Sequence, residues 1–128
     1  MPKKISLAKQ TRLWDPTKNK DHFIKGEASE ETAVQILKAR GAEIMFRNRR
    51  LPYGEVDIVA LKDEIIYIIE VKTVAQADHV VGRIGYRQKR VLRYNRMWIE
   101  EEFKLPTKIL WAFVLGQKVF WVRDEGEV

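Results

Sequence analysis

The 128-residue chain contains no cysteine. This absence excludes disulfide bonds and thiolate metal sites, and it fits a reducing compartment such as the cytoplasm. Long apolar runs are missing too, because the longest, residues 109–115, is far shorter than the roughly 20 residues that span a bilayer. The basic first residues are not followed by an apolar segment, so no secretory signal is expected. These absences predict a soluble, cytoplasmic protein without membrane contacts.

Acidic residues are outnumbered, with 18 aspartates and glutamates against 24 lysines and arginines, for a net charge of +6. Such a balance favours a polyanionic partner, usually nucleic acid, although many basic proteins bind none. Only two histidines occur, His22 and His79, and both are expected at the surface rather than acting as bases. With 45% apolar residues, no repeats and no internal linker, the chain suits one folded domain.

The expected elements follow the order α-β-β-β-α-β-β, which predicts an α/β fold with a mixed sheet flanked by helices. Residues 1–25 form a basic arm, and residues 26–128 form the single domain. The first helix is expected from about Ala28 to Arg40, ending at Gly41, and the second from 84 to 103. The other expected segments are a strand at 43–47, a turn-rich basic segment at 48–54, a central hairpin, a polar loop at 74–82 and a last hairpin of 108–115 and 118–123.

The central hairpin carries four polar residues, Glu55, Asp57, Glu70 and Lys72. Side chains alternate along a strand, so each pair shares a face. If the strands fold back around 63–64, Asp57 lies opposite Glu70 and Glu55 opposite Lys72, with Cβ atoms about 5 Å apart. Two carboxylates at that separation can share a divalent cation, and the lysine can act on a nearby water or phosphate. The alternative is a solvated strand end whose charges merely pair.

The apolar residues of this hairpin occupy both faces, which predicts strands covered on both sides. Val56 is expected on the same face as Ile58, and Val59 on the other. Charges at the end of such strands are costly unless they are paired, metal-bound or at the lip of a cleft. The sequence Asp63-Glu64 lacks the glycine that two-residue turns favour, so a four-residue loop, 62–65, with the same register is expected.

The two helices add further charged candidates. Glu30 falls within the apolar arc of the first helix and is expected to point inward, although acids in a first turn also serve the helix dipole. The second helix carries Lys89, Arg93 and Arg96 on one outer arc, with no acid before Glu100. A charge run is usually a solvated helix face, but this one suggests phosphate contacts.

A helix glutamate, a strand aspartate and a Glu-x-Lys strand in this order resemble the PD-(D/E)XK nuclease superfamily. The chain is most similar to its YraN-like group (UPF0102), which is related to archaeal Holliday junction resolvases. Ser29 stands where that group typically has glycine, and Ala112 where an acid is common. The resemblance implies a restriction-endonuclease-like fold, a mixed β-sheet core flanked by α-helices. The matching segments are the first helix from Gly26 to Gly41, Arg47-Asn48-Arg49-Arg50, Gly54-Glu55-Val56-Asp57, Glu70-Val71-Lys72 and Lys89.

By this resemblance, Asp57 and Glu70 would hold Mg²⁺ or Mn²⁺, with Glu30 as a further ligand or holding a metal-bound water. Lys72 would orient or deprotonate the attacking water, or stabilise charge on the phosphorane. Glu55 would be a partner of Lys72 or an additional ligand. Side chains that would hold the nucleic-acid backbone are Arg47, Arg49, Arg50, Lys89, Arg93 and Arg96. The implied activity is a metal-dependent endonuclease hydrolysing phosphodiester bonds in DNA, with branched or damaged DNA as candidate substrates.

Two other functions stay open. One is a nucleic-acid-binding module that has kept the fold but cleaves little or nothing, and the other is a protein-assembly module. Cleavage of a junction would need two active sites, and therefore a homodimer. The candidate dimer surface is the last hairpin, although its aromatics are more often core residues: Trp111, Phe113, Phe120 and Trp121.

Overall fold

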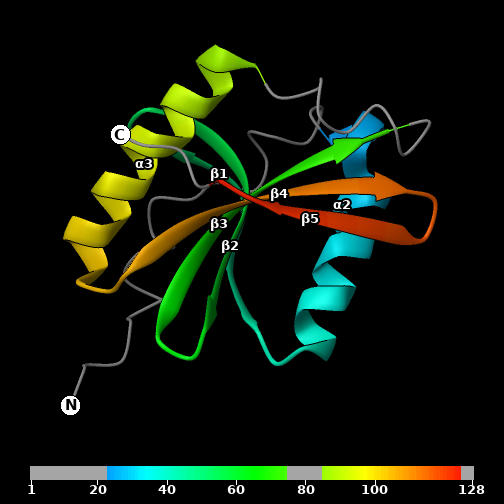
Figure 1. Cartoon of the computed structure of the whole chain (residues 1–128), viewed down its shortest axis with the longest axis horizontal. Coiled ribbons are helices and arrows are strands. Elements are labelled where there is room, and N and C mark those ends of the chain that lie inside the picture. Colours follow the sequence, from blue (N-terminus) through cyan, green and yellow to red (C-terminus); the bar gives the residue numbers. More distant parts are fainter. Residues whose placement is uncertain (1–22, 75–84, 125–128) are drawn as a thin grey trace.

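The computed structural model describes residues 23–74 and 85–124 and has the predicted order α-β-β-β-α-β-β. Five strands form one mixed sheet in the order β1-β2-β3-β4-β5, in which only β3 and β4 run parallel (Figure 1). The predicted fold class is therefore confirmed. The elements are α2 (Phe23–Ala39), β1 (Glu43–Leu51), β2 (Gly54–Lys62), β3 (Ile65–Thr73), α3 (Tyr86–Phe103), β4 (Thr107–Leu115) and β5 (Lys118–Arg123).

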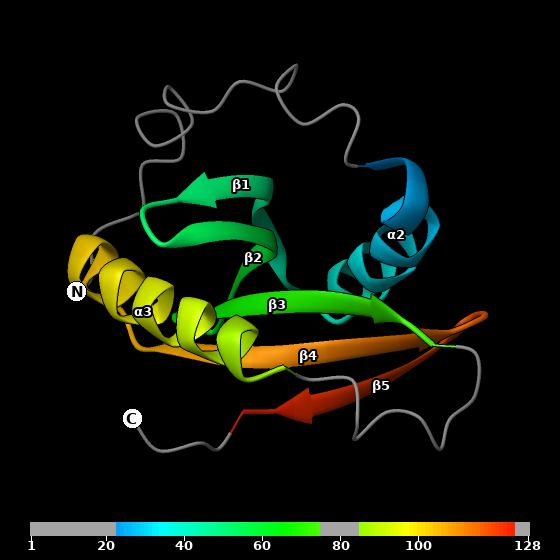
Figure 2. The same ribbon diagram turned by 90° about the horizontal axis from the view of Figure 1, so that it is seen from above.

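Each helix packs against its own part of the sheet, and Figure 2 shows α2 and α3 well apart. Val34 of α2 packs with Ile58 and Ile69 in one apolar cluster. Leu92 of α3 belongs to the other cluster, which also contains Ile68. Because consecutive residues of β3 enter different clusters, the apolar runs of the central strands are explained by burial on both faces. Within the described residues, neither helix is long and apolar enough to cross a membrane.

Several predicted boundaries were wrong. Helix α2 begins at Phe23, five residues before the predicted start, and so takes up the end of the predicted basic arm; residues 1–22 of that arm lie outside the described residues. Gly41 does follow the helix end, with φ +92°. Strand β1 runs to Leu51 and includes most of the predicted turn segment, because its hydrogen bonds to β2 continue to the Leu51–Gly54 pair.

The register of the central hairpin is as predicted, from the Ile58–Ile69 pair to the Lys62–Ile65 pair. Its turn is not, because Asp63 and Glu64 alone connect the strands. Both residues have positive φ, 52° and 65°. This is the conformation of primed two-residue turns, which match the strand twist and favour glycine. The tight turn therefore places two non-glycine residues in a left-handed conformation that costs energy.

Replacing Glu64 with glycine should relieve part of this cost. We expect Glu64→Gly to raise the free energy of unfolding by about 0.5–1 kcal/mol, since glycine adopts positive φ without steric penalty. Urea denaturation measures the change. Glu64→Ala is the matched control, because it removes the same charge and keeps Cβ, and it should bring no such gain. Equal effects of the two variants would contradict the backbone explanation.

The alternation of β2 breaks next to Asp57. Val56 packs with Val59 in the α3 cluster, whereas Ile58 lies in the α2 cluster, so the prediction that Val56 and Ile58 share a face was wrong. The paired residues of β2 and β3 also end at Ile58 and Ile69. The positions predicted to oppose each other, Asp57 with Glu70 and Glu55 with Lys72, lie beyond that last pair. The two strands therefore part where the candidate residues begin.

Candidate functional site

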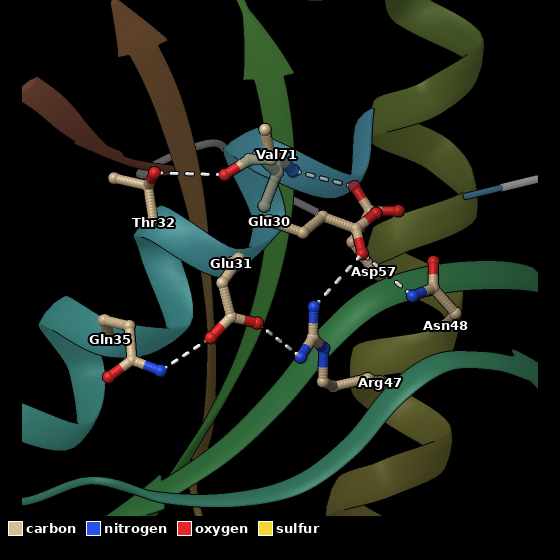
Figure 3. A network of polar contacts seen from close by, with 9 residues as sticks. Glu30, Glu31, Thr32, Gln35, Arg47, Asn48, Asp57 and Val71 are labelled. Atoms are coloured by element: carbon tan, nitrogen blue, oxygen red, sulfur yellow. Dashed lines mark hydrogen bonds and ion pairs between the residues drawn. The ribbon is translucent and has the colours of Figure 1, made fainter. Parts of the chain in front are cut away.

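The candidate site lies where β2 and β3 separate. Asp57 of β2 bridges the two strands, because its Oδ2 accepts a hydrogen bond of 2.8 Å from the backbone N–H of Val71 (Figure 3). The side chain of Asp57 thus takes the place of the backbone pairing, which ends at the adjacent residue Ile58. This contact holds the Asp57 carboxylate against the Glu-x-Lys segment of β3.

Helix α2 brings Glu30 to the same place, and Figure 3 shows it beside Asp57. Glu30 is only 7% exposed, as the inward-facing pattern predicted. Its Oε1 accepts a 2.8 Å hydrogen bond from Nδ2 of Asn48 and lies 3.9 Å from the guanidinium of Arg47. The pKa of Glu30 is raised to about 7, because burial, the largest cause, and the charge of Asp57 outweigh the lowering effect of the Asn48 hydrogen bond.

The neighbouring residue Ser29 helps to fix this position. Ser29 and Thr73 share a hydrogen bond of 2.6 Å between their hydroxyl groups, which joins α2 to the end of β3. Ser29 is itself buried. The serine that stands where the YraN-like group typically has glycine therefore makes a specific contact one residue from Glu30.

Burial makes ionisation of both Asp57 and Glu70 costly. Burial raises the pKa of Asp57, and the hydrogen bond from Val71 and the charge of Lys72 oppose the rise. Burial also raises the pKa of Glu70 to about 8, and the charge of Asp57 adds to the effect. The Oε1 atom of Glu70 is buried and makes no hydrogen bond in the structure. Carboxyl groups in such surroundings favour a proton or a cation.

The other two residues of the predicted cluster are also close. The charge of Lys72 favours the ionised forms of both Asp57 and Glu70, and that of Glu55 opposes ionisation of Asp57. Glu55 has a buried Oε2 atom without a hydrogen-bond partner. The structure therefore brings together all four residues that sequence analysis singled out in the hairpin.

A cavity of about 220 Å³ opens between these carboxylates and α3. Two polar residues of α3, Arg87 and Gln88, were not predicted to be part of the site. Only the packing of α3 against the sheet reveals them. The residues lining the cavity are Glu55, Glu70, Arg87, Gln88, Val91 and Leu92.

Asn48 is another residue whose role was missed. It is buried and has φ +50° within β1, where most residues would be strained. Asparagine tolerates this left-handed conformation better than other non-glycine residues. Its amide reaches Glu30, so the unusual backbone places a neutral donor on the buried carboxyl. A lone asparagine in a basic strand gave no sequence signal for this contact.

The predicted phosphate-binding residues of β1 have three different surroundings. Arg47 is half-buried and pairs with Glu31 at 3.0 Å as well as with Glu30. Arg49 is buried, with its guanidinium 4.4 Å from the centre of the Phe46 ring, and burial lowers its pKa. This position does not suit a contact with a nucleic-acid backbone. Arg50 is exposed.

The basic residues of α3 are partly engaged within the protein. Arg93 makes two hydrogen bonds of 3.3 Å to Asp124, and Arg96 lies 3.4 Å from Glu100. Lys89 is half-buried. Among the cations predicted on β1 and α3, Arg50 and Lys89 are therefore placed best for contacts with phosphates. Arg87, which lines the cavity, is a further candidate.

The donor atoms of the site suit a hard divalent cation. Asp57 and Glu70 offer carboxylate oxygens, the ligands that Mg²⁺ and Mn²⁺ prefer, and Glu70 contributes an oxygen with no other partner. Within residues 23–74 and 85–124, however, no three histidine, cysteine, aspartate or glutamate side chains are grouped so that they could hold a metal ion together. Glu30 as a third ligand stays a prediction.

The sequence of this chain is similar to that of a family of known proteins. The model of the uncharacterised protein family UPF0102 matches residues 29–113. A UPF0102 protein of Campylobacter hominis is 38% identical over 78 residues, covering 60% of this chain and 70% of that protein. One from Helicobacter pylori strain HPAG1 is 32% identical over 84 residues, covering 66% and 74%, respectively. The matched region contains Glu30, Asp57, Glu70 and Lys72, and the chain belongs to family UPF0102.

Proposed function

We propose that this protein is a metal-dependent endonuclease that hydrolyses phosphodiester bonds in DNA. The observation that carries the proposal is the cluster of Asp57, Glu70 and Glu30, three carboxyl groups in a partly buried site whose pKa values are raised first by burial and further by neighbouring carboxylates. An assembly of this kind is costly to the fold unless something offsets its charge. Clusters of carboxyl groups that destabilise the fold in this way are expected at functional sites.

A Mg²⁺ or Mn²⁺ ion, when bound by Asp57 and Glu70, would neutralise charge on a scissile phosphate and lower the pKa of a bound water. Mg²⁺ keeps several waters, so two carboxylates can suffice. Lys72 stands beside both carboxylates and would orient the attacking water or stabilise charge developing on the phosphate. Glu30, held by Asn48, would accept a hydrogen bond from a water at the site when ionised, and its pKa of about 7 allows that near neutral pH.

The surroundings of the cluster are basic, which supports a polyanionic substrate. Arg87 lies at the cavity that contains Glu70, Lys89 lies half a turn further along α3, and Arg50 is exposed on β1 near Glu55, its paired residue on β2. Contacts of such residues with phosphates would position a strand without reading its sequence. Branched and damaged DNA are the substrates to test first.

The test is cleavage of labelled duplex, single-stranded and four-way-junction DNA with Mg²⁺ or Mn²⁺, each repeated in EDTA. We expect Asp57→Asn to lower metal-dependent cleavage by at least about a hundredfold, or roughly 3 kcal/mol of transition-state stabilisation. Asp63→Asn is the matched control, because it makes the same chemical change at an exposed turn and should leave the rate unchanged. Equal rates for the wild type and Asp57→Asn, or no cleavage of any DNA, would refute the proposal.

A nucleic-acid-binding module without cleavage is the second candidate. It is favoured by the lack of a ready three-ligand metal group among the described residues. This function predicts DNA binding that weakens steeply with salt and is the same in Mg²⁺ and EDTA. Binding of Mn²⁺, measured as a rise in melting temperature, separates the two functions. Only the nuclease should show a rise that the Asp57→Asn substitution abolishes.

A further inference from the structure

Two tyrosines form a tilted ring pair at the surface where the β1–β2 hairpin meets α3. Tyr53, in the turn of the hairpin, is 53% exposed, and Tyr94 of α3 is 45% exposed. Their ring centres are 5.3 Å apart and the rings are inclined by 35°. This spacing is within the range of favourable aromatic pairs. The pair therefore presents a large aromatic surface to solvent without being part of either core cluster.

A buried polar clamp fixes this arrangement. Asn95 is fully buried; its Oδ1 accepts a 3.0 Å hydrogen bond from the backbone N–H of Tyr53, and its Nδ2 donates to the carbonyl of Gly54 at 3.2 Å. Asn95 was not predicted to have a role. These two hydrogen bonds tie the turn to α3 on either side of the peptide bond between Tyr53 and Gly54. The aromatic pair is therefore preorganised and needs little ordering to bind a partner.

Cations extend from this aromatic pair to the candidate site. Arg87, Arg90, Tyr94 and Met97 recur at helical spacing along one exposed face of α3. The guanidinium of Arg90 lies 6.0 Å from the centre of the Tyr94 ring. Arg87 lines the cavity that contains Glu70. Helix α3 has no acidic residue before Glu100. The aromatic and positively charged side chains of this face are therefore not interrupted by negative charge.

We propose that Tyr53, Tyr94, Arg87 and Arg90 form a platform for the unpaired nucleotides of a DNA strand, whose backbone continues to the carboxylate cluster. The inference rests on the proposed nuclease function and names its substrate class. Bases stack on exposed aromatic rings and arginines hold the adjacent phosphates, which is how proteins bind single strands without reading sequence. Paired bases inside a duplex cannot offer their faces in this way, so DNA with an unpaired segment is the preferred substrate.

The charge of the same face argues against a second copy as its occupant. A two-fold interface brings the same patch of both protomers together. Arg87 and Arg90 of one protomer would then approach their counterparts, which disfavours association. A polyanion meets this surface with the opposite charge.

Binding measured by fluorescence anisotropy tests the platform in EDTA, where metal-dependent cleavage cannot interfere. The probes are an unstructured thymidine oligonucleotide and a blunt-ended DNA duplex, which has no unpaired segment. We expect Tyr94→Ala to weaken binding of the oligonucleotide by roughly ten- to a hundredfold, the range for loss of base stacking on one ring. Tyr94→Phe should bind normally, and Phe120→Ala is the matched control, because it removes an exposed aromatic from β5. Binding of the duplex should change less than about threefold in all of them.

Three results would overturn the inference: equal wild-type affinity for both probes, equal loss of both in Tyr94→Ala, or a dimer in sedimentation that Tyr94→Ala dissociates. If the alanine variant fails to fold, Tyr94→Leu keeps apolar packing and lacks the aromatic face, and the same losses are expected. The Asp57→Asn variant should retain selective oligonucleotide binding. The two proposals can therefore fail separately. If the protein binds unpaired DNA selectively but the wild type cleaves no DNA, only the nuclease function is refuted.

Discussion

Glu70→Gln is expected to stabilise the metal-free protein at alkaline pH while it removes the response to metal ions. Burial and the charge of Asp57 raise the pKa of Glu70 from 4.5 to about 8, so its ionisation opposes folding. Glutamine has nearly the same shape and cannot ionise. We expect a gain of up to about 5 kcal/mol in the free energy of unfolding at pH 9, since the pKa rises from 4.5 to about 8 and each pH unit of that rise corresponds to about 1.4 kcal/mol.

The sign of the pH dependence follows from proton binding. Between pH 4.5 and about 8 the folded protein holds the Glu70 proton more tightly than the unfolded chain does. The contribution of Glu70 to stability is therefore fully present below pH 4.5 and is lost as the pH rises towards 8. Glu30, with its pKa raised to about 7, acts in the same direction over a narrower range. The advantage of Glu70→Gln should accordingly be near zero at pH 4.5 and largest above pH 8.

Thermal melts in EDTA at several pH values measure this advantage, and melts with added Mn²⁺ measure metal binding. Metal should stabilise the wild type more at pH 8 than at pH 6, because its ligands must lose their protons first. Glu102→Gln, at an exposed helix position, is the matched control and should change stability little at any pH. A Glu70→Gln protein no more stable than the wild type at pH 9 would show that Glu70 ionises there without cost.

The structure explains why such a cost can be tolerated. Asp57 keeps one strong compensating contact, the N–H of Val71, and Glu30 keeps the Asn48 amide, but Glu70 Oε1 has no hydrogen-bond partner. Of these three carboxyl groups, Glu70 is thus the one that a ligand would benefit most. Groups left in this state in an otherwise well-packed fold are expected at sites whose ligand supplies the missing interaction.

Sequence patterns predicted the parts of this fold that depend on local periodicity. The hairpin register followed from folding two apolar runs back around residues 63–64, and Gly41 marked the end of α2, as the structure confirms. The turn was wrong because a preference for glycine is weaker than a register enforced by two buried faces, so Asp63 and Glu64 accept positive φ. The start of α2 was wrong because no capping signal marked Phe23.

The candidate site was predictable to the extent that its residues lie on regular elements. Glu30 and Asp57 followed from helical and strand periodicity together with the family resemblance. Asn48, Asn95 and Arg87 did not, because their roles arise from contacts between elements distant in the sequence. The burial of Arg49 was hidden for a related reason: its guanidinium rests on Phe46, a contact made possible by the backbone irregularities of β1 rather than by simple alternation.

Gly54 connects the core, the tyrosine platform and the carboxylate cluster. Its φ is +144°, and a Cβ added there would lie 2.7 Å from Cγ1 of Val91. Its carbonyl accepts the hydrogen bond from Asn95, and the next residue is Glu55 of the candidate site. A side chain at this position must therefore strain the backbone, displace α3 or shift the start of β2.

We expect Gly54→Ala to lower the free energy of unfolding by about 2–4 kcal/mol, the combined cost of an unfavourable φ and of overpacking against Val91. Urea denaturation measures the loss. Gly116→Ala is the matched control, because Gly116 also has positive φ, +63°, but nothing lies within 4 Å of its added Cβ, so it should cost only about 1 kcal/mol. Combining Gly54→Ala with Val91→Ala should cost less than the sum of the single changes, since removal of the Val91 methyl groups relieves the overlap. Costs that are equal at Gly54 and Gly116, or that add without coupling to Val91, would show that close packing against α3 does not hold this turn in place.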